Sequence, residues 1–291
     1  MLLRAALEII DRLVAALPSR VAYALADVGG DAWHRLGSRR RALVAANLAR
    51  VCAATGRPVR GRSFDALVRS AFRHHARYYV ELLRTPHYPA ERIAEIVEVP
   101  GWPEYEPVLR GGATVMLSWH VGNFEPFGSY LAHHGIRALS PIEEITPRPL
   151  FEFLAARRGG RSVDLVLLRD ARRPLTRRLR EGGMVGIIGD RDLSGDGHPV
   201  TIFGHPTTFP LGPASLAVTQ RAAIIVGRCL RVGPDRFLAE GEVIDAPTGK
   251  GGRATITALA ERLATRFELD VATAPEQWWG AFQPFWPDLK A

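Results

Sequence analysis

The chain has 291 residues, of which 47% are hydrophobic and 23% charged, which excludes a disordered protein and fits one globular domain with a helical extension. Its net charge is +8, and residues 1–100 supply most of it, with 16 arginines and no lysine against 9 acidic residues. The two cysteines, Cys52 and Cys229, lie far apart and form no metal or redox motif, which indicates structural thiols in a reducing compartment.

The first predicted element is an amphipathic helix at the N-terminus. No stretch reaches the roughly 18 consecutive apolar residues that a spanning helix needs, and the start lacks the ordered segments of a signal peptide. Arg4, Glu8, Asp11 and Arg12 form one polar stripe, and leucine, isoleucine and valine cover most of the remaining surface. The pattern fits a helix on an anionic membrane surface. It fits a helix packed on the protein core equally well, and both interpretations stay open.

Residues 1–88 are predicted to be helical with short breaks, and the helix over residues 64–83 ends before Thr85-Pro86. His74-His75 lies in this helix among several arginines, which is typical of a solvated or membrane-facing basic surface. We therefore expect residues 1–100 to form a membrane-associating helical region. Residues 101–291 are expected to form the α/β core, continuous with the helical region as one domain.

From residue 114 onward, apolar strands alternate with helices. The predicted strands cover residues 114–119, 162–168, 184–189, 223–226 and 237–243. The predicted helices cover residues 124–134, 149–158, 174–181, 213–221 and 254–269. This alternation indicates an α/β sandwich with helices on both faces of a central sheet.

The strand over residues 113–118 runs into His120, and a Gly122-Asn123 turn separates this histidine from Glu125. On one continuous helix the two side chains would point about 140° apart. With Asn123 as N-cap after the turn, they can meet. The spacing predicts a His–carboxylate dyad that takes a proton from a hydroxyl. The pair could also ligate a metal, but no third ligand has recognisable spacing, and we predict none.

A second polar group, Asp190-Arg191-Asp192, follows the predicted strand 184–189. Functional groups of open α/β sheets gather at the carboxyl ends of strands, and an arginine can grip a headgroup or a phosphate. A local ion-pair network explains the same three residues. The loop over residues 194–199 is too irregular for a simple hairpin turn, as in segments that cover a site. Arg157-Arg158 closes a helix, where the helix dipole alone accounts for basic residues.

Other catalytic motifs do not occur: the chain has no G-x-S-x-G, Walker loop, G-x-G-x-x-G after a strand or H-E-x-x-H. The motifs that do occur resemble those of the bacterial lysophospholipid acyltransferase superfamily, in its lipid A and phosphatidylinositol mannoside acyltransferase branch. The resemblance runs from about residue 5 to residue 287. It rests on His120-x4-Glu125, Asn47-Leu-x-Arg50-Val51, Arg73-x3-Arg77-Tyr78, Pro149-x-Phe151 with Arg157-Arg158, Asp190-Arg-Asp-Leu193, Phe203-Gly-x-Pro206 with Gly212-Pro-Ala, and Glu276-Gln-Trp-x4-Gln283-Pro-x-Trp286.

The resemblance implies an αβα sandwich of glycerol-3-phosphate acyltransferase type with a mixed central sheet, and residues 101–291 would be its acyltransferase core. It also implies acyl transfer from a thioester to a glycolipid hydroxyl, with no cofactor and no covalent intermediate. His120 would be the general base and Glu125 would orient and charge-stabilise the imidazole. Asp190 and Arg191 would line the acceptor or transition-state side. Arg158 or Arg157 would contact a headgroup or the donor phosphates, and backbone N–H groups near Gly122-Asn123 are a hypothesis for the oxyanion site.

We expect a peripheral enzyme on the cytoplasmic face of the inner membrane, using acyl-CoA on a glycolipid of the phosphatidylinositol mannoside type. Relatives acting on lipid A often carry an N-terminal spanning helix. This chain has no apolar stretch long enough for one, which favours a phosphatidylinositol mannoside as acceptor. One alternative is a lipid A precursor as acceptor with an acyl carrier protein as donor. Another is a non-catalytic lipid-binding protein. An anionic membrane surface fits the positive charge, whereas nucleic-acid binding fits that charge and nothing else.

Overall fold

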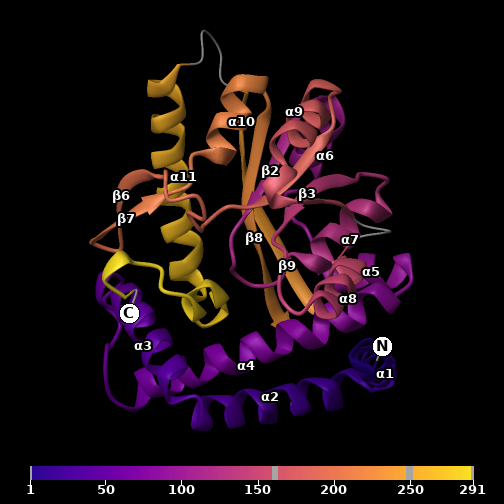
Figure 1. Ribbon diagram of the computed structural model, residues 1–291, viewed down its shortest axis with the longest axis vertical. Helices are drawn as coiled ribbons and strands as arrows, with labels where there is room; N and C mark the ends of the chain where they lie inside the picture. Colours follow the sequence, from indigo (N-terminus) through magenta and orange to yellow (C-terminus); the bar gives the residue numbers. More distant parts are fainter. Residues whose placement is uncertain (1, 159–162, 247–251, 290–291) are drawn as a thin grey trace.

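The computed structural model describes residues 2–158, 163–246 and 252–289, and it is a mixed α/β protein (Figure 1). Its N-terminal third is helical, as predicted. The helices are α1 (Leu2–Ala16), α2 (Ser19–Leu36), α3 (Ser38–Ala54), α4 (Arg62–Arg84) and α5 (Ala90–Ile96), with the 3-10 turn η1 (Thr85–His87) between the last two. In Figure 1, α2 and α4 lie side by side along the base of the molecule, with α1 at one end.

The central sheet has seven strands in the order β1-β9-β8-β2-β5-β3-β4. They are β1 (Val97–Glu98), β2 (Thr114–Ser118), β3 (Ala138–Ile142), β4 (Val163–Leu167), β5 (Met184–Ile188), β8 (Ala223–Gly233) and β9 (Arg236–Ile244). Every neighbouring pair is parallel except β8 with β9, so the sheet is mixed and mostly parallel. The predicted strand over residues 162–168 begins one residue outside the described part of the chain.

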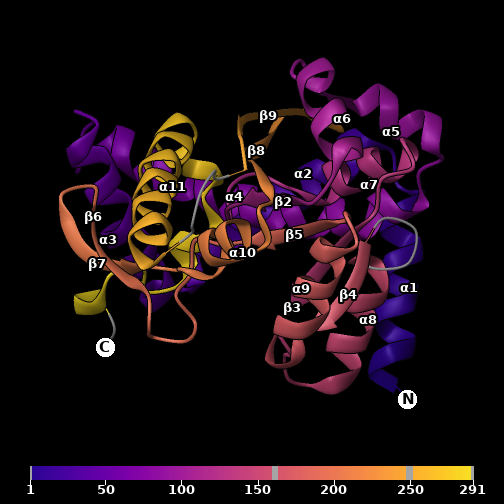
Figure 2. The same cartoon turned by 90° about the horizontal axis from the view of Figure 1, so that it is seen from above.

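Helices pack on both faces of this sheet. Successive strand residues point to opposite sides, so the apolar side chains of one strand contact helices on both faces. Val115 and Leu117 of β2 join the core with α9 (Arg172–Arg180), α10 (Gly212–Gln220) and α11 (Arg253–Thr273). Met116 packs toward the other face, against the cluster formed with α5, α6 (Trp102–Gly111) and α7 (Glu125–His133). Figure 2 shows the two helical layers from above, with α8 (Arg148–Arg158) beside α1.

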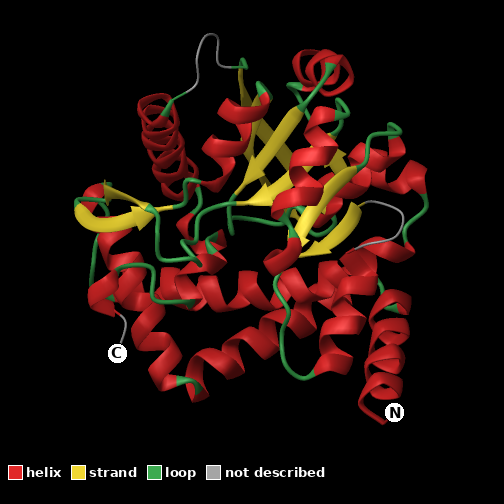
Figure 3. Cartoon of the chain, turned by 45° about the horizontal axis from the view of Figure 1, so that its top comes forward, coloured by secondary structure: helices red, strands yellow, loops and turns green. Residues whose placement is uncertain are grey.

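A separate two-stranded antiparallel hairpin, β6 (His198–Ile202) with β7 (His205–Phe209), was not predicted. It begins inside the segment expected to be an irregular loop. Figure 3 shows this hairpin apart from the main sheet and close to the C-terminal segment. That segment consists of three 3-10 turns: η3 (Pro275–Gln277), η4 (Trp279–Phe282) and η5 (Pro287–Leu289).

The basic face of α4 is turned toward α2, which corrects the prediction of a solvated or membrane-facing surface. Arg69 and Arg73 both hold Asp31, with Nε–Oδ1 distances of 2.6 and 2.8 Å, and Arg77 holds Asp27 at 2.6 Å. The His74-His75 pair is also packed inside the protein, and burial lowers the pKa of the two imidazoles to about 3 and about 4. The ion pairs of Asp27 and Asp31 with these arginines therefore attach α2 to α4.

The outward surface of α1 and α2 is apolar. Ile9 and Leu13 of α1 are 59% and 62% exposed, and Leu25 and Val28 of α2 are 56% and 67% exposed. Asp11, which belongs to the polar stripe of α1, is instead buried. Ile9 and Leu13 therefore do not pack on the core, although the helix itself packs against α4 and α8. Membrane binding of the exposed face of α1 stays a prediction. No helix within the described ranges is long and apolar enough to cross a membrane.

Candidate active site

The turn that carries His120 is held between β8 and the C-terminal segment. Gly122 N donates to Gln277 O at 2.9 Å and Asn123 N donates to Cys229 O at 2.7 Å. Gly122 has φ +69°, and a Cβ there would lie 2.0 Å from Cys229 O, so only glycine fits. Because both N–H groups are already bonded, these two are not free to form the oxyanion site.

The carboxylate on the His120 imidazole is Asp190, not Glu125 as predicted. His120 Nδ1 lies 2.6 Å from Asp190 Oδ1, and His120 N also donates to that oxygen at 3.2 Å. The two residues follow β2 and β5, which are hydrogen-bonded neighbours in register from Thr114 to Ser118. Two parallel strands therefore bring together groups that are 70 residues apart in the chain.

Asp190 is completely enclosed, and its environment fixes the imidazole. Burial alone would raise the pKa of Asp190, but the imidazole and the N–H donors outweigh this, so its pKa lies below the ordinary value. An ionised carboxylate at Nδ1 favours the tautomer with hydrogen on Nδ1 and a lone pair on Nε2. His120 also lines the cavity described below. The arrangement can therefore present a base to a ligand in that cavity.

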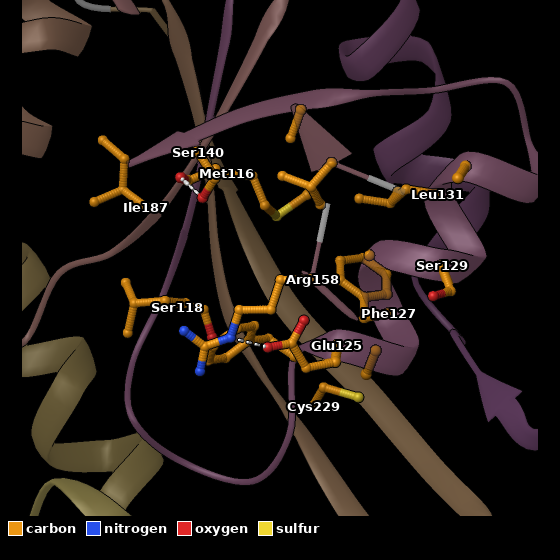
Figure 4. Close-up of a pocket in the computed structure, with 18 of the residues that line it drawn as sticks. Met116, Ser118, Glu125, Phe127, Ser129, Leu131, Ser140, Arg158, Ile187 and Cys229 are labelled. Carbon is orange, nitrogen blue, oxygen red and sulfur yellow. Dashed lines mark hydrogen bonds and ion pairs between the residues drawn. The ribbon is translucent and has the colours of Figure 1, made fainter. Parts of the chain in front are cut away.

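Glu125 instead belongs to a second cluster with Arg158 and Tyr78. Arg158 Nε donates to Glu125 Oε1 at 2.9 Å (Figure 4). Arg158 Nη2 donates to Tyr78 Oη at 2.6 Å, and Tyr78 Oη lies 3.3 Å from the same glutamate oxygen. Burial raises the pKa of Glu125 against the opposing charge of Arg158. The glutamate thus fixes the Arg158 guanidinium at the edge of the cavity.

Asn123, predicted to contact substrate, is buried and bonded only within the protein. Its Oδ1 accepts from Glu125 N at 3.0 Å and its Nδ2 donates to Glu81 Oε2 at 2.8 Å. The helix α7 begins at Glu125, with Phe124 as the residue before it, one position later than predicted. Asn123 therefore shapes the turn and does not line the cavity.

The two clusters border a cavity of about 660 Å³ between β2, β3, β5, β8 and the helices α7 and α8. Its lining is largely apolar and includes Met116, Phe127, Leu131, Met184 and Ile225. His120, Glu125, Arg158 and Ser118 also line it. Figure 4 places Ser118, Glu125 and Arg158 together, with Met116 and Leu131 farther along the cavity. The cavity is therefore largely apolar, with Ser118, Glu125 and Arg158 gathered in one part of it and His120 two residues along the chain from Ser118.

The remaining predicted arginines also reach this cavity, although other carboxylates hold them. Arg191 Nη1 lies 3.2 Å from Glu143 Oε2. Arg157 makes two bonds to Asp11, at 2.9 and 2.6 Å, and so connects α8 to α1. Asp192 lies apart, accepting from Gly195 N and Gly197 N at 2.9 and 3.1 Å. Backbone N–H groups and the Thr208 hydroxyl therefore hold Asp192, and neither ligand binding nor a local ion-pair network describes it.

Sequence reasoning gave no role to Trp279, which lies against His120. The two rings meet edge to face with centroids 4.3 Å apart, and the indole stacks on Tyr78 at 4.8 Å. Trp279 directly follows the Gln277-Trp278 motif, and this position was the one feature of the sequence that could have indicated its place at the site. Within the described ranges, no group of three or more His, Cys, Asp or Glu residues is arranged to hold a metal ion.

Comparison with known proteins gives consistent results. A family model described as bacterial lipid A biosynthesis acyltransferase matches residues 5–286. The chain is 28% identical over 280 residues to a protein of Mycolicibacterium smegmatis named phosphatidylinositol mannoside acyltransferase, covering 94% of this chain and 88% of that protein. A Mycobacterium tuberculosis protein of the same name is 27% identical over 229 residues, covering 76% of this chain and 71% of that protein.

Proposed function

The chain belongs to the bacterial lipid A biosynthesis acyltransferase family and is therefore an acyltransferase, and we propose that it moves a fatty acyl chain from acyl-CoA to a hydroxyl of a phosphatidylinositol mannoside. The observation that carries this proposal is the His120–Asp190 pair, whose imidazole borders a largely apolar cavity. The names of the two mycobacterial relatives support the acceptor.

In the proposed reaction, His120 Nε2 takes the proton from the acceptor hydroxyl as its oxygen attacks the thioester carbon. The carbonyl electron pair moves to oxygen, then returns as the C–S bond breaks. The thiolate leaves and recovers a proton from the imidazolium. Asp190 keeps the imidazole oriented and stabilises its charge. This direct transfer needs no protein nucleophile, metal or cofactor, which stays a prediction.

The cavity supports an elongated apolar ligand. Its size falls within the roughly 300–1,000 Å³ of typical ligand pockets. We place the acyl chain among Met116, Phe127 and Leu131, and the thioester beside His120. Arg158, fixed by Glu125 and Tyr78, supplies a positive charge for a headgroup or a donor phosphate. Arg157 and Arg191 remain further candidates at the same cavity.

The exposed apolar face of α1 and α2 supports peripheral attachment to an anionic membrane. Isoleucine and leucine face outward on α1, and Val21, Leu25 and Val28 lie one or two turns apart on the outside of α2. Arg20 and Arg35, exposed near the two ends of α2, suit anionic headgroups. We propose that this surface docks on the cytoplasmic face of the inner membrane.

The more specific comparison of the fold with the glycerol-3-phosphate acyltransferase sandwich also stays a prediction.

The description of the family model favours a second candidate, acyl transfer from a carrier protein to a lipid A precursor. Purified protein is incubated with palmitoyl-CoA or palmitoyl carrier protein, and with mycobacterial glycolipids or a lipid A precursor. Product is identified by mass spectrometry, beside a His120→Ala control. A glycolipid one palmitoyl heavier with wild type alone supports the proposal. Product only with the carrier protein and the lipid A precursor would establish the second candidate instead, and equal product in the control would reject the role of His120.

A further inference from the structure

Ser118 occupies the stretch of β2 between the apolar part of the cavity and His120. Met116, Ser118 and His120 line the cavity and are partly exposed, whereas Val115, Leu117 and Trp119 are completely buried, although Leu117 also borders the cavity. This alternation follows from the two-residue period of an extended chain, in which alternate residues share a face about 6.6 Å apart. Along this edge the order is therefore an apolar side chain, a hydroxyl and the imidazole.

The Ser118 hydroxyl has no acceptor within the part of the chain that the structure describes. The backbone carbonyl of Ser118 is already hydrogen-bonded, since Ser118 O accepts from Gly189 N at 2.9 Å. Ser140, a second serine of the cavity, differs because its Oγ donates to Gly186 O at 2.6 Å. Among these two hydroxyls, only that of Ser118 is free to donate to a ligand.

Acyl transfer requires a donor at the carbonyl oxygen, which becomes negatively charged during attack. The two backbone N–H groups of the turn, at Gly122 and Asn123, are already bonded to other carbonyls. We place the acyl chain beside Met116, and the acceptor hydroxyl is hydrogen-bonded to His120. The thioester carbon that this hydroxyl attacks then lies between them, beside Ser118. The Arg158 guanidinium lies in the same part of the cavity and adds positive charge (Figure 4).

We propose that Ser118 Oγ–H donates a hydrogen bond to the thioester carbonyl oxygen and holds the oxyanion as the acceptor attacks. The inference rests on the proposed function. The serine keeps its proton throughout: the new C–O bond forms, the carbonyl pair moves to the oxygen that Ser118 binds, and the pair returns as the C–S bond breaks. Ser118 is thus a catalytic residue that forms no bond to the acyl group.

The test compares Ser118→Ala, Ser118→Thr and Ser140→Ala with wild type in steady-state and single-turnover acyl transfer from palmitoyl-CoA. Loss of one oxyanion donor lowers turnover by about 10²-fold. We expect that loss for Ser118→Ala with little change in KM, because the bond strengthens only in the transition state. Ser118→Thr keeps the hydroxyl and is expected to retain most activity. Ser140→Ala is expected to lower kcat at least tenfold less than Ser118→Ala.

Several outcomes would overturn the inference. If wild type transfers the acyl group and His120→Ala does not, the proposed function stands, and an undiminished kcat in Ser118→Ala would then reject the oxyanion role alone. A rise confined to KM would show that the hydroxyl only binds substrate. An acylated Ser118 peptide in mass spectrometry would show a nucleophile instead. No transfer by wild type with any donor would reject both proposals.

Discussion

Glu81 and Arg231 form a buried ion pair that connects the outer helices to the catalytic turn. Their side chains are 1% and 3% exposed. Glu81 also accepts from Tyr23 Oη of α2 at 2.7 Å and from Asn123 Nδ2 at 2.8 Å. Since Asn123 in turn binds Glu125 N, this glutamate supports the start of α7 from behind. Its charge is therefore structural, and no part of the proposed chemistry uses it.

Glu81→Ala leaves Arg231 as an unpaired buried charge. Removing one partner of a buried pair costs about 3–5 kcal/mol, and we expect that loss in the free energy of unfolding, measured by urea denaturation. Glu95→Ala is the matched control, because Glu95 and its partner Arg92 are 64% and 44% exposed. Exposed pairs contribute about 0–1 kcal/mol. Equal losses in the two variants would contradict a structural role for the buried pair.

Glu125→Gln keeps the size of the side chain and removes its charge. Because Glu125 holds Arg158 Nε and does not touch the imidazole, we expect turnover to fall more than acceptor binding weakens, as Arg158 loses its fixed position. Turnover and acceptor KM are measured together. A change confined to acceptor affinity would show that the cluster only binds the acceptor.

The sequence allowed His120 to be predicted at a site, but not its partner. Local spacing suggested Glu125, five positions away, and that geometry depends only on the turn. The contact with Asp190 depends on β2 and β5 being neighbours, which no local pattern encodes. Asn123 was misassigned for a related reason, because its buried partner Glu81 lies on a distant helix.

At the scale of elements, α2 is attached to α4 by arginines that share Asp31. The two guanidinium groups lower the pKa of this carboxyl below its ordinary value. A depressed folded pKa means that the stabilisation is present above the unfolded pKa, near about 4, and is lost as pH falls below it. The α2–α4 contact should therefore weaken in acid.

Asp31→Asn is expected to lower the free energy of unfolding by about 1.5–3 kcal/mol at neutral pH, because the charged hydrogen bonds are lost. The difference between wild type and variant should shrink as pH falls from about 5 to 3. Taking this difference cancels the titration of His74 and His75, which is common to both proteins. Denaturation curves across that range provide the measurement, and a difference independent of pH would contradict an ionised Asp31.

Most helices and central strands followed from apolar periodicity and from glycine and proline positions. The strand β3 was missed because Pro141 interrupts its pattern, and β6 because it contains Pro199. The orientation of α1 could not be predicted either. Its polar stripe faces inward at Asp11 because Arg157 and His87 lie there, and the sequence of the helix alone does not contain that information.

At the scale of the whole molecule, the exposed apolar face of α1 and α2 is the proposed membrane surface. The Leu13→Asp variant should weaken binding to vesicles containing anionic lipid, because it places a charge in that face. Leu269→Asp is the control, since Leu269 is 61% exposed on α11. Vesicle sedimentation at low and high salt measures both. Equal losses in the two variants would contradict docking through this face.

The pairing of His120 with Asp190 at the acyl cavity is the central claim, and a double-mutant cycle tests it most directly. Single-turnover transfer from palmitoyl-CoA is measured for His120→Ala, Asp190→Asn and the double variant. Residues that act as one unit give non-additive losses. We expect His120→Ala to leave only a small residual rate, Asp190→Asn to lower the rate by about 10⁴-fold, and the double variant to lose no more than His120→Ala. Additive losses, or normal turnover in His120→Ala, would contradict the account.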